Sequence, residues 1–228
     1  MIRVRAVAAL VMSPIFLTLP LCAVDFSTYR GFQFGANLET SAKQAGAKLA
    51  DVKPVHLRPA LIQELEWRSA SVYSSGVEKS DPVREGLLRF YNGALFQIVT
   101  TYDRQKVEGM SEADIVAAIS QTYGTAATKP AAEIAYHTYY GETAPVLARW
   151  EDAEYSYNLV RTGDQASYAL IMSQKRLEVL AQTAILASNR SEALEAPQKA
   201  LDLQKKQEVD ARLLLDKARA VNVPNFKP

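Results

Sequence analysis

The chain has 228 residues, of which 48% are hydrophobic and 22% charged, and its 26 lysines and arginines nearly balance 25 aspartates and glutamates. These proportions are typical of a globular protein and exclude a disordered chain, a collagen-like repeat and a protein with many membrane spans. The balanced charge also argues against a dedicated nucleic-acid-binding protein, because such proteins carry a basic excess. We therefore expect no nucleic acid among the partners.

The N-terminal segment, residues 1–23, has the pattern of a secretory signal peptide. Arg3 and Arg5 are its only charged residues, and the stretch that follows them is almost entirely apolar. Ala23 is a small residue suited to the cleavage position, so we expect a periplasmic or secreted protein without a membrane span after processing. Two alternatives stay open. One is an uncleaved anchor, and the other is a lipoprotein acylated at Cys22, which is less favoured because a leucine rather than a small residue precedes this cysteine.

Cys22 is also the only cysteine of the chain. Cleavage after Ala23 removes it and leaves a mature protein with no disulfide, no thiol nucleophile and no thiolate metal ligand. The fold must then depend on its apolar core.

Residues 24–104 are expected to form a first α+β unit. Asn37 is a helix-capping residue and Gly46 a helix-ending one, so a short helix is predicted between them. Further on, Asn92-Gly93 stands between two apolar runs, which predicts a β-hairpin.

A strand is predicted at 61–67, between this helix and the hairpin. Its alternating pattern places Glu64 and Glu66 together on one face and the apolar side chains on the other. Two carboxylates on one face resemble a catalytic pair, but the alternation favours a solvated face of the sheet.

Residues 105–174 are expected to form a second unit of the same kind. Ser111 followed by Asp114 is a capping box, and apolar residues recur at four-residue spacing from Ile115. Gly124 is expected to end this helix in the left-handed conformation. Three strands then follow at 146–150, 154–160 and 167–172.

The two units align with each other as tandem repeats. Gly35 matches Gly109 before each helix, and Arg89 matches Arg149 in the strands at a smaller offset, with a longer loop in the first unit to account for the difference. Because hairpins join neighbouring strands, we expect one antiparallel sheet with the helices on one face, which is the α+β class.

A glycine, a capping residue and a short amphipathic helix, followed by a meander with an Asn-Gly hairpin, resemble the BamE/SmpA-like domain of bacterial envelope lipoproteins. The resemblance covers about residues 29–173 and depends mainly on Gly109-Met110-Ser111, Tyr123-Gly124 and Asn92-Gly93. Two such units in tandem are also similar to the secreted β-lactamase-inhibitor proteins. Both groups are binding modules, so the resemblance implies protein binding rather than catalysis.

Residues 175–228 form a glycine-free tail that is rich in alanine, leucine, lysine, glutamate and glutamine, which predicts helix. Pro197 is expected to kink or end this helix, and a second helix is predicted from Gln198. Three interpretations stay open: the tail packs loosely on the body, docks a partner, or pairs with a second copy as a coiled coil. The expected apolar stripes are Leu177, Leu180, Ala184 and Ala187 before the proline, and Leu201, Val209, Leu213 and Leu214 after it.

The motifs of common enzyme and metal sites are missing from the sequence. His56 and His137 are the only histidines and are far apart, so no zinc site is expected, and no phosphate-binding or dinucleotide-binding glycine loop is present. We therefore expect neither an enzyme nor a protein that holds a cofactor or metal.

An aromatic cluster is a candidate partner-binding face, because tyrosine and tryptophan dominate protein interfaces. The alternative, favoured for the two tyrosines that share a strand face, is that the rings pack against a helix. The candidates are Tyr136, His137, Tyr139, Tyr140, Trp150, Tyr155 and Tyr157, with Tyr168 nearby.

Two functions follow from these features. The first is a non-catalytic protein-interaction module or scaffold in the bacterial cell envelope, whose tail is also available for self-association. The alternative is a secreted inhibitor that covers the cleft of an enzyme with its sheet. The scaffold is favoured if the tail binds an envelope protein. The inhibitor is favoured if the chain binds one soluble enzyme tightly.

Overall fold

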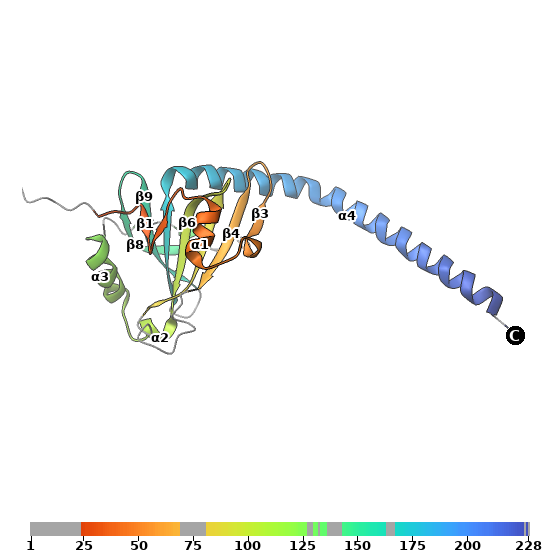
Figure 1. The fold of residues 1–228 in the computed structure, drawn as a ribbon, viewed down its shortest axis with the longest axis horizontal. Helices are drawn as coiled ribbons and strands as arrows, with labels where there is room; N and C mark the ends of the chain where they lie inside the picture. The colour runs from red at the N-terminus through yellow and green to blue at the C-terminus, as the bar shows by residue number, and fades with distance from the viewer. Residues whose placement is uncertain are drawn as a thin grey trace, which may run out of the picture.

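The computed structural model describes residues 24–68, 81–126, 130–131, 133–135, 143–162, 167–225 and 227. These residues form a body built on one eight-stranded antiparallel sheet, and a long C-terminal helix runs along the body and then projects from it (Figure 1). The expected α+β fold class is therefore confirmed.

The first unit contains a small hairpin, a helix and four strands of the sheet. The helix α1 is capped by the side chain of Asn37, which accepts the N–H of Thr40 at 2.8 Å, and Gly46 ends it in the left-handed conformation, as predicted. Asn92 and Gly93 have φ values of 48° and 82° and form the predicted hairpin turn. The elements are β1 Thr28–Tyr29, β2 Phe32–Gln33, α1 Leu38–Ala45, η1 Leu49–Asp51, β3 Lys53–His56, β4 Ile62–Arg68, β5 Val83–Tyr91 and β6 Ala94–Tyr102.

The second unit likewise has a capped helix, α3, and four strands of the sheet. The capping box of α3 is confirmed, because Asp114 N–H donates to Ser111 Oγ at 3.2 Å and Ser111 N–H donates to Asp114 Oδ2 at 2.8 Å. Gly124 has the expected positive φ of 77°, but its ψ of −176° makes it extended rather than left-handed helical. The elements are α2 Arg104–Val107, α3 Glu112–Tyr123, β7 Glu133–Ala135, β8 Thr143–Glu151, β9 Tyr155–Thr162 and β10 Ser167–Gln174.

The strand order of the sheet, β3-β4-β5-β6-β10-β9-β8-β7, places the two meanders back to back. They meet where Ile98 pairs with Met172, and these residues have the same separation in the chain as Gly35 and Gly109. The spacing of the two glycines is therefore the spacing of the repeat in the structure. Strand β5, which precedes β6, then corresponds to β9, which precedes β10. The predicted match of Arg89 with Arg149 is wrong, because Arg89 lies in β5 and Arg149 lies in β8, the counterpart of β4.

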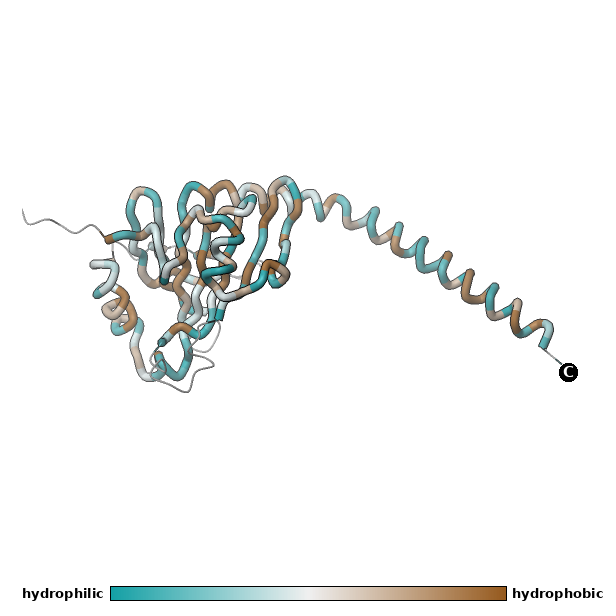
Figure 2. Tube along the Cα trace, in the orientation of Figure 1, coloured by the Kyte–Doolittle hydropathy of each residue, from teal (hydrophilic) through white to brown (hydrophobic). Residues whose placement is uncertain are grey.

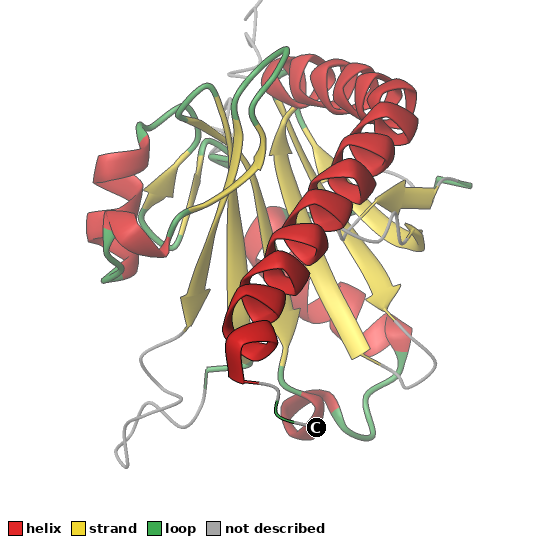
Figure 3. Cartoon of the chain, turned by 90° about the vertical axis from the view of Figure 1, so that its right-hand side faces the viewer, coloured by secondary structure: helices red, strands yellow, loops and turns green. Residues whose placement is uncertain are grey.

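The two faces of the sheet are covered by different parts of the chain. One face packs against the β1–β2 hairpin, α1 and α3 around a core rich in aromatic rings. The opposite face carries the start of helix α4, Lys175–Asn225, which contacts β5, β6 and β10. Figure 3 shows α4 in front of the strands, with its far part directed toward the viewer.

Helix α4 is continuous from Lys175 to Asn225, with Pro197 in its interior. The prediction of a separate helix from Gln198 is therefore wrong. A proline inside a helix removes one backbone hydrogen bond and bends the helix rather than always ending it. Figure 1 shows that α4 changes direction as it leaves the body, which agrees with the kink that the proline predicts.

Candidate functional site

Helix α4 divides into two halves with different surroundings. Residues 175–195, which we call the seated half, lie on the sheet, whereas residues 196–225, the projecting half, are exposed throughout. Within the residues that the structure describes, no helix is both long enough and apolar enough to cross a membrane, and α4 is no exception. The projecting half is thus a long helical surface that the body leaves uncovered.

Small side chains bring the seated half close to the sheet. Ala181 is fully buried and belongs to a cluster with Ile62 and Phe96, and Ala184 and Ser188 are buried further along the same side of the helix. The apolar stripe predicted before the proline is therefore only partly correct. Ala184 is buried and Leu177 packs partly on this cluster, whereas Leu180 is 42% exposed and Ala187 is exposed.

A buried polar network lies between the seated half and the sheet. Arg89, which is 3% exposed, donates from Nε to Glu64 at 3.0 Å and from its guanidinium to Gln97 at 2.6 Å. The Gln97 amide in turn donates to Ser173 at 3.1 Å and to Glu178 of α4 at 3.2 Å. Through Gln97 the helix is thus tied to an ion pair inside the sheet.

Burial sets the protonation behaviour of this network. It lowers the pKa of Arg89, and the charges of Glu64 and Glu178 oppose that change. Burial also raises the pKa of Glu178, while hydrogen bonds from Ser173 and Gln97 act in the opposite direction. An unpaired charge in such a site is costly, so the network favours one placement of α4 on the sheet.

The carboxylates of β4 differ from the solvated pair that the sequence predicts. They share one face of the strand, as expected, but α4 covers part of that face. Glu64 is 8% exposed and paired with Arg89, whereas Glu66 is exposed and pairs with Lys53 at 2.6 Å. The prediction of a fully solvated face is therefore wrong for Glu64, and the pair is divided between two different partners.

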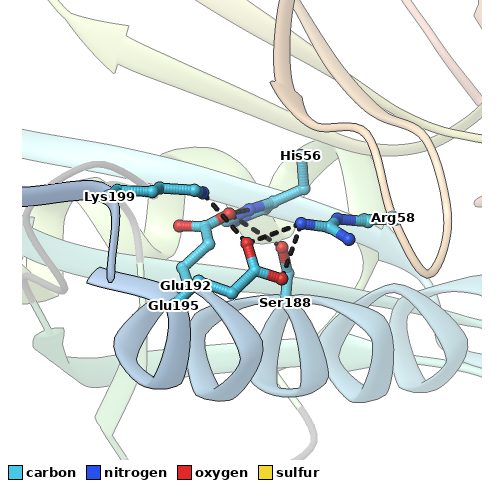
Figure 4. Close-up of polar contacts among 6 residues, drawn as sticks. All are labelled: His56, Arg58, Ser188, Glu192, Glu195 and Lys199. Carbon is cyan, nitrogen blue, oxygen red and sulfur yellow. Dashed lines mark hydrogen bonds and ion pairs between the residues drawn. The ribbon is translucent and has the colours of Figure 1, made fainter. Parts of the chain in front are cut away.

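A second group of charges holds the seated half at the point where α4 leaves the body (Figure 4). The Arg58 guanidinium donates to both carboxylate oxygens of Glu195 at 2.7 Å, and Lys199 Nζ lies 3.0 Å from the same carboxylate. One turn earlier, His56 Nδ1 lies 3.3 Å from Glu192 Oε1. We call this group, His56, Arg58, Ser188, Glu192, Glu195 and Lys199, the clamp.

The clamp favours ionised carboxylates. A hydrogen bond from Ser188, at 3.0 Å, and the contact with His56 lower the pKa of Glu192. Lys199, and to a smaller extent Arg58, lower the pKa of Glu195. The clamp therefore fixes the exit of the projecting half most firmly when both glutamates are charged.

The projecting half carries large aliphatic side chains that no described part of the body covers. Leu203 is 58% exposed, Leu214 67% and Val221 61%. Figure 2 shows hydrophobic segments recurring along this part of α4 between hydrophilic ones. Single exposed leucines are ordinary on a protein surface, but a row of them along one helix is a candidate interaction site.

The sequence contains a signal for this site in the spacing of its uncharged residues, which the aliphatic residues alone do not reveal. Seven positions, each three or four residues after the last, lie on one side of the projecting half and include no charged residue. They are Ala200, Leu203, Gln207, Ala211, Leu214, Ala218 and Val221, which we call the uncharged stripe. Of the aliphatic residues predicted after the proline, only Leu214 belongs to it.

The aromatic candidates do not form one exposed face in the described part of the chain. Trp150 is 1% exposed, and its Nε1 donates to the carbonyl of Gly124 at 2.9 Å. Tyr157 is fully buried, and its ring meets those of Phe26 and Tyr123 at 5.0 Å. These two rings are therefore part of the core, because β8 and β9 direct them toward α3.

The remaining aromatic candidates are only partly described. Tyr155 is half-buried, and its ring lies 5.5 Å from that of Phe34. Tyr136, His137, Tyr139 and Tyr140 lie outside the described residues.

Two further observations bear on function. Among the described residues, no group of three or more histidines, cysteines, aspartates or glutamates has a metal-binding arrangement. Comparison of the chain with protein-family models, with curated proteins and with solved structures finds no match.

Proposed function

We propose that this chain is a non-catalytic, exported protein that acts as an interaction module or scaffold in the bacterial cell envelope, with the projecting half of α4 as its docking element. One observation carries the proposal: a continuous helix extends beyond the body with its aliphatic side chains exposed. Thirty residues of helix are about 45 Å long. The signal-peptide pattern of residues 1–23 supports export.

Pairing with another helix is the binding mode that the uncharged stripe supports. Its three-and-four spacing is that of helix–helix interfaces, and its alanines allow close approach of a second helix. Six basic and four acidic residues between Gln198 and Val221 lie around the rest of the helix. The partner is an envelope protein or a second copy of this chain, and either one would cover the same stripe.

Inhibition of an enzyme by the sheet has less support. The alternative needs a free sheet face, whereas α4 lies on one face and the β1–β2 hairpin, α1 and α3 lie on the other. No contact or exposed patch of the described sheet favours it over docking by α4.

Two neighbouring leucines provide a matched test. Leu214 lies in the uncharged stripe and Leu213 lies about 100° around the helix from it, and both are more than half exposed. We expect Leu214→Glu to abolish capture of a specific protein by cross-linking in an envelope fraction, or to abolish self-association in sedimentation equilibrium. Leu213→Glu has the same charge change and should leave both intact.

The stability of both variants is the necessary control. Neither leucine contacts the body, so both proteins should unfold at the same denaturant concentration as the parent protein. Equal retention of every partner by the two variants, together with monomeric behaviour of the parent protein, would contradict the proposal.

A further inference from the structure

A cavity lies on the opposite side of the sheet from α4, at the junction of the two units. Its volume is about 360 Å³, and its walls come from the β1–β2 hairpin, the end of β6, α2 and α3. This volume is within the lower part of the range for small-molecule sites. The cavity shares no lining residue with the projecting half of α4, so it is independent of the docking function.

The floor of the cavity is apolar. Ile115 and Ile119 of α3 approach it from one side, and Leu170 of β10 forms part of its base. Val83 and Val107 continue this surface toward α2. An apolar chain or ring that enters the cavity removes its own surface and that of these side chains from water, which favours binding.

Three tyrosines from different elements line the same cavity. Tyr29 comes from β1, Tyr102 from the end of β6 and Tyr123 from the end of α3. Burial is the main cause that raises the pKa of Tyr123 to about 12 and raises that of Tyr102 still further. Both phenols are therefore protonated at neutral pH and available as hydrogen-bond donors.

Two of these tyrosines have hydroxyls that are available to a ligand. No hydrogen bond joins the hydroxyl of Tyr102 or Tyr123 to another described residue, and both side chains line the cavity. A ligand that carries an acceptor group would receive hydrogen bonds from them.

The charged groups at the cavity favour an anionic acceptor. Arg30 and Lys106 both line it, and no acidic residue is among the described residues of its lining. The Arg30 guanidinium lies 5.7 Å from the centre of the Tyr29 ring and is held by Asp81, with two bonds of 2.7 and 2.8 Å. Because Asp81 occupies that guanidinium, the donors left for a ligand are mainly phenols, which suit a carboxylate better than a phosphate dianion.

We propose that this cavity binds a small amphipathic carboxylate, such as a medium-chain fatty acid. The apolar chain lies against Ile115, Ile119 and Leu170, and the carboxylate accepts hydrogen bonds from Tyr102 and Tyr123. Bonds to a charged acceptor are stronger than bonds between neutral groups, so these tyrosines contribute to affinity as well as to orientation.

Calorimetric titration with decanoate tests this proposal, with decan-1-ol as the uncharged ligand of the same chain length. We expect one decanoate per chain and at least tenfold weaker binding of the alcohol. Tyr102→Phe keeps the ring and removes the donor, and should weaken decanoate binding about tenfold or more, the effect of losing a hydrogen bond to a charged group. Tyr91→Phe, on the α4 side of the sheet, should leave the affinity unchanged.

A further variant separates the cavity from the exposed helix. Leu214→Glu should bind decanoate as the parent protein does, because the uncharged stripe is not part of the cavity. The proposal is overturned if decanoate fails to saturate one site, if the alcohol binds equally well, or if Tyr102→Phe and Tyr91→Phe have the same affinity. Loss of decanoate binding in Leu214→Glu would also overturn it, because the ligand would then lie on α4.

Discussion

The seated and projecting halves of α4 belong to one continuous helix, yet their apolar residues have different roles. The seated half buries alanine and serine against sheet residues such as Ile62 and Phe96, while its larger Leu177 and Ile185 pack on this cluster only partly buried. The projecting half exposes leucine and valine and has no such counterpart. Hydrophobic content therefore does not decide which half is buried. What decides it is whether a complementary surface and matching polar groups lie opposite the helix.

The body also supports the projecting half. An isolated helix of about this length is only marginally stable in water, because its first turn is costly to form. The seated half supplies turns that are already formed and fixed by Arg89, Gln97 and the clamp. The projecting half then extends an existing helix. The body thus presents a preformed helix to a partner, which lowers the conformational entropy lost on binding.

The largest expected effect comes from the ion pair beneath the seated half. Arg89→Met removes the buried ion pair with Glu64 and the hydrogen bond to Gln97, so the free energy of unfolding should fall by about 3–5 kcal/mol. Urea denaturation measures the change. Lys53→Met removes an exposed partner of Glu66 and should cost less than about 1 kcal/mol. Equal effects of the two substitutions would show that the network does not hold α4 in place.

The next largest loss of stability is expected when an alanine of the seated half is replaced by leucine. The same replacement in the projecting half is the control. Ala181→Leu inserts a larger side chain where the helix touches the sheet, and overpacking of this kind typically costs about 1–3 kcal/mol. Ala211→Leu places the same side chain on the exposed uncharged stripe and should change stability by no more than about 0.5 kcal/mol. Thermal unfolding of both proteins gives the difference. A similar loss for Ala211→Leu would mean that the projecting half is packed in solution.

Local signals in the sequence predicted local structure well. The capping box of Ser111 and Asp114, the cap at Asn37 and the Asn92-Gly93 turn each depend on residues within four positions of one another. The α+β class follows from these elements and from the alternation in the strands. The strands β3 and β7 and the short helix α2 were not predicted, because each is only three or four residues long.

The candidate site was harder to predict because it depends on contacts between distant segments. Strand alternation shows that Glu64 and Glu66 share a face, but only the tertiary structure shows that α4 covers Glu64. The same applies to Trp150, whose indole N–H is satisfied by the carbonyl of Gly124 rather than by a partner. The uncharged stripe, by contrast, is visible in the sequence once the positions of the charged residues are examined together with the aliphatic ones.

A smaller effect is expected from the pH dependence of the clamp. The pKa of Glu195 is lowered in the folded protein, so its contribution to stability is present above the ordinary carboxyl pKa of about 4.5 and is lost as the pH falls through the lowered value. Glu195→Gln should therefore destabilise the protein at pH 7 and have no effect at strongly acidic pH. Glu208→Gln in the projecting half should have no measurable effect at either pH. A destabilisation by Glu195→Gln that is the same at both values would contradict the clamp.

The smallest effect on stability is expected from removing the projecting half. Ending the chain at Ala196 removes Pro197 and all that follows it, which is the projecting half except for its first residue. Of the clamp contacts it removes only the exposed ion pair of Lys199 with Glu195, because His56, Arg58, Ser188 and Glu192 all remain. The buried contacts of Ala181, Ala184 and Ser188 remain as well. Thermal unfolding should then stay within a few degrees of the full protein, while far-ultraviolet circular dichroism loses the helical signal of about 30 residues and the partner of the Leu214 test is no longer captured. If the shortened protein instead fails to fold, the projecting half contributes to the body and the two halves of α4 cannot be separated. If it folds and still captures the same partner, the docking surface lies on the body.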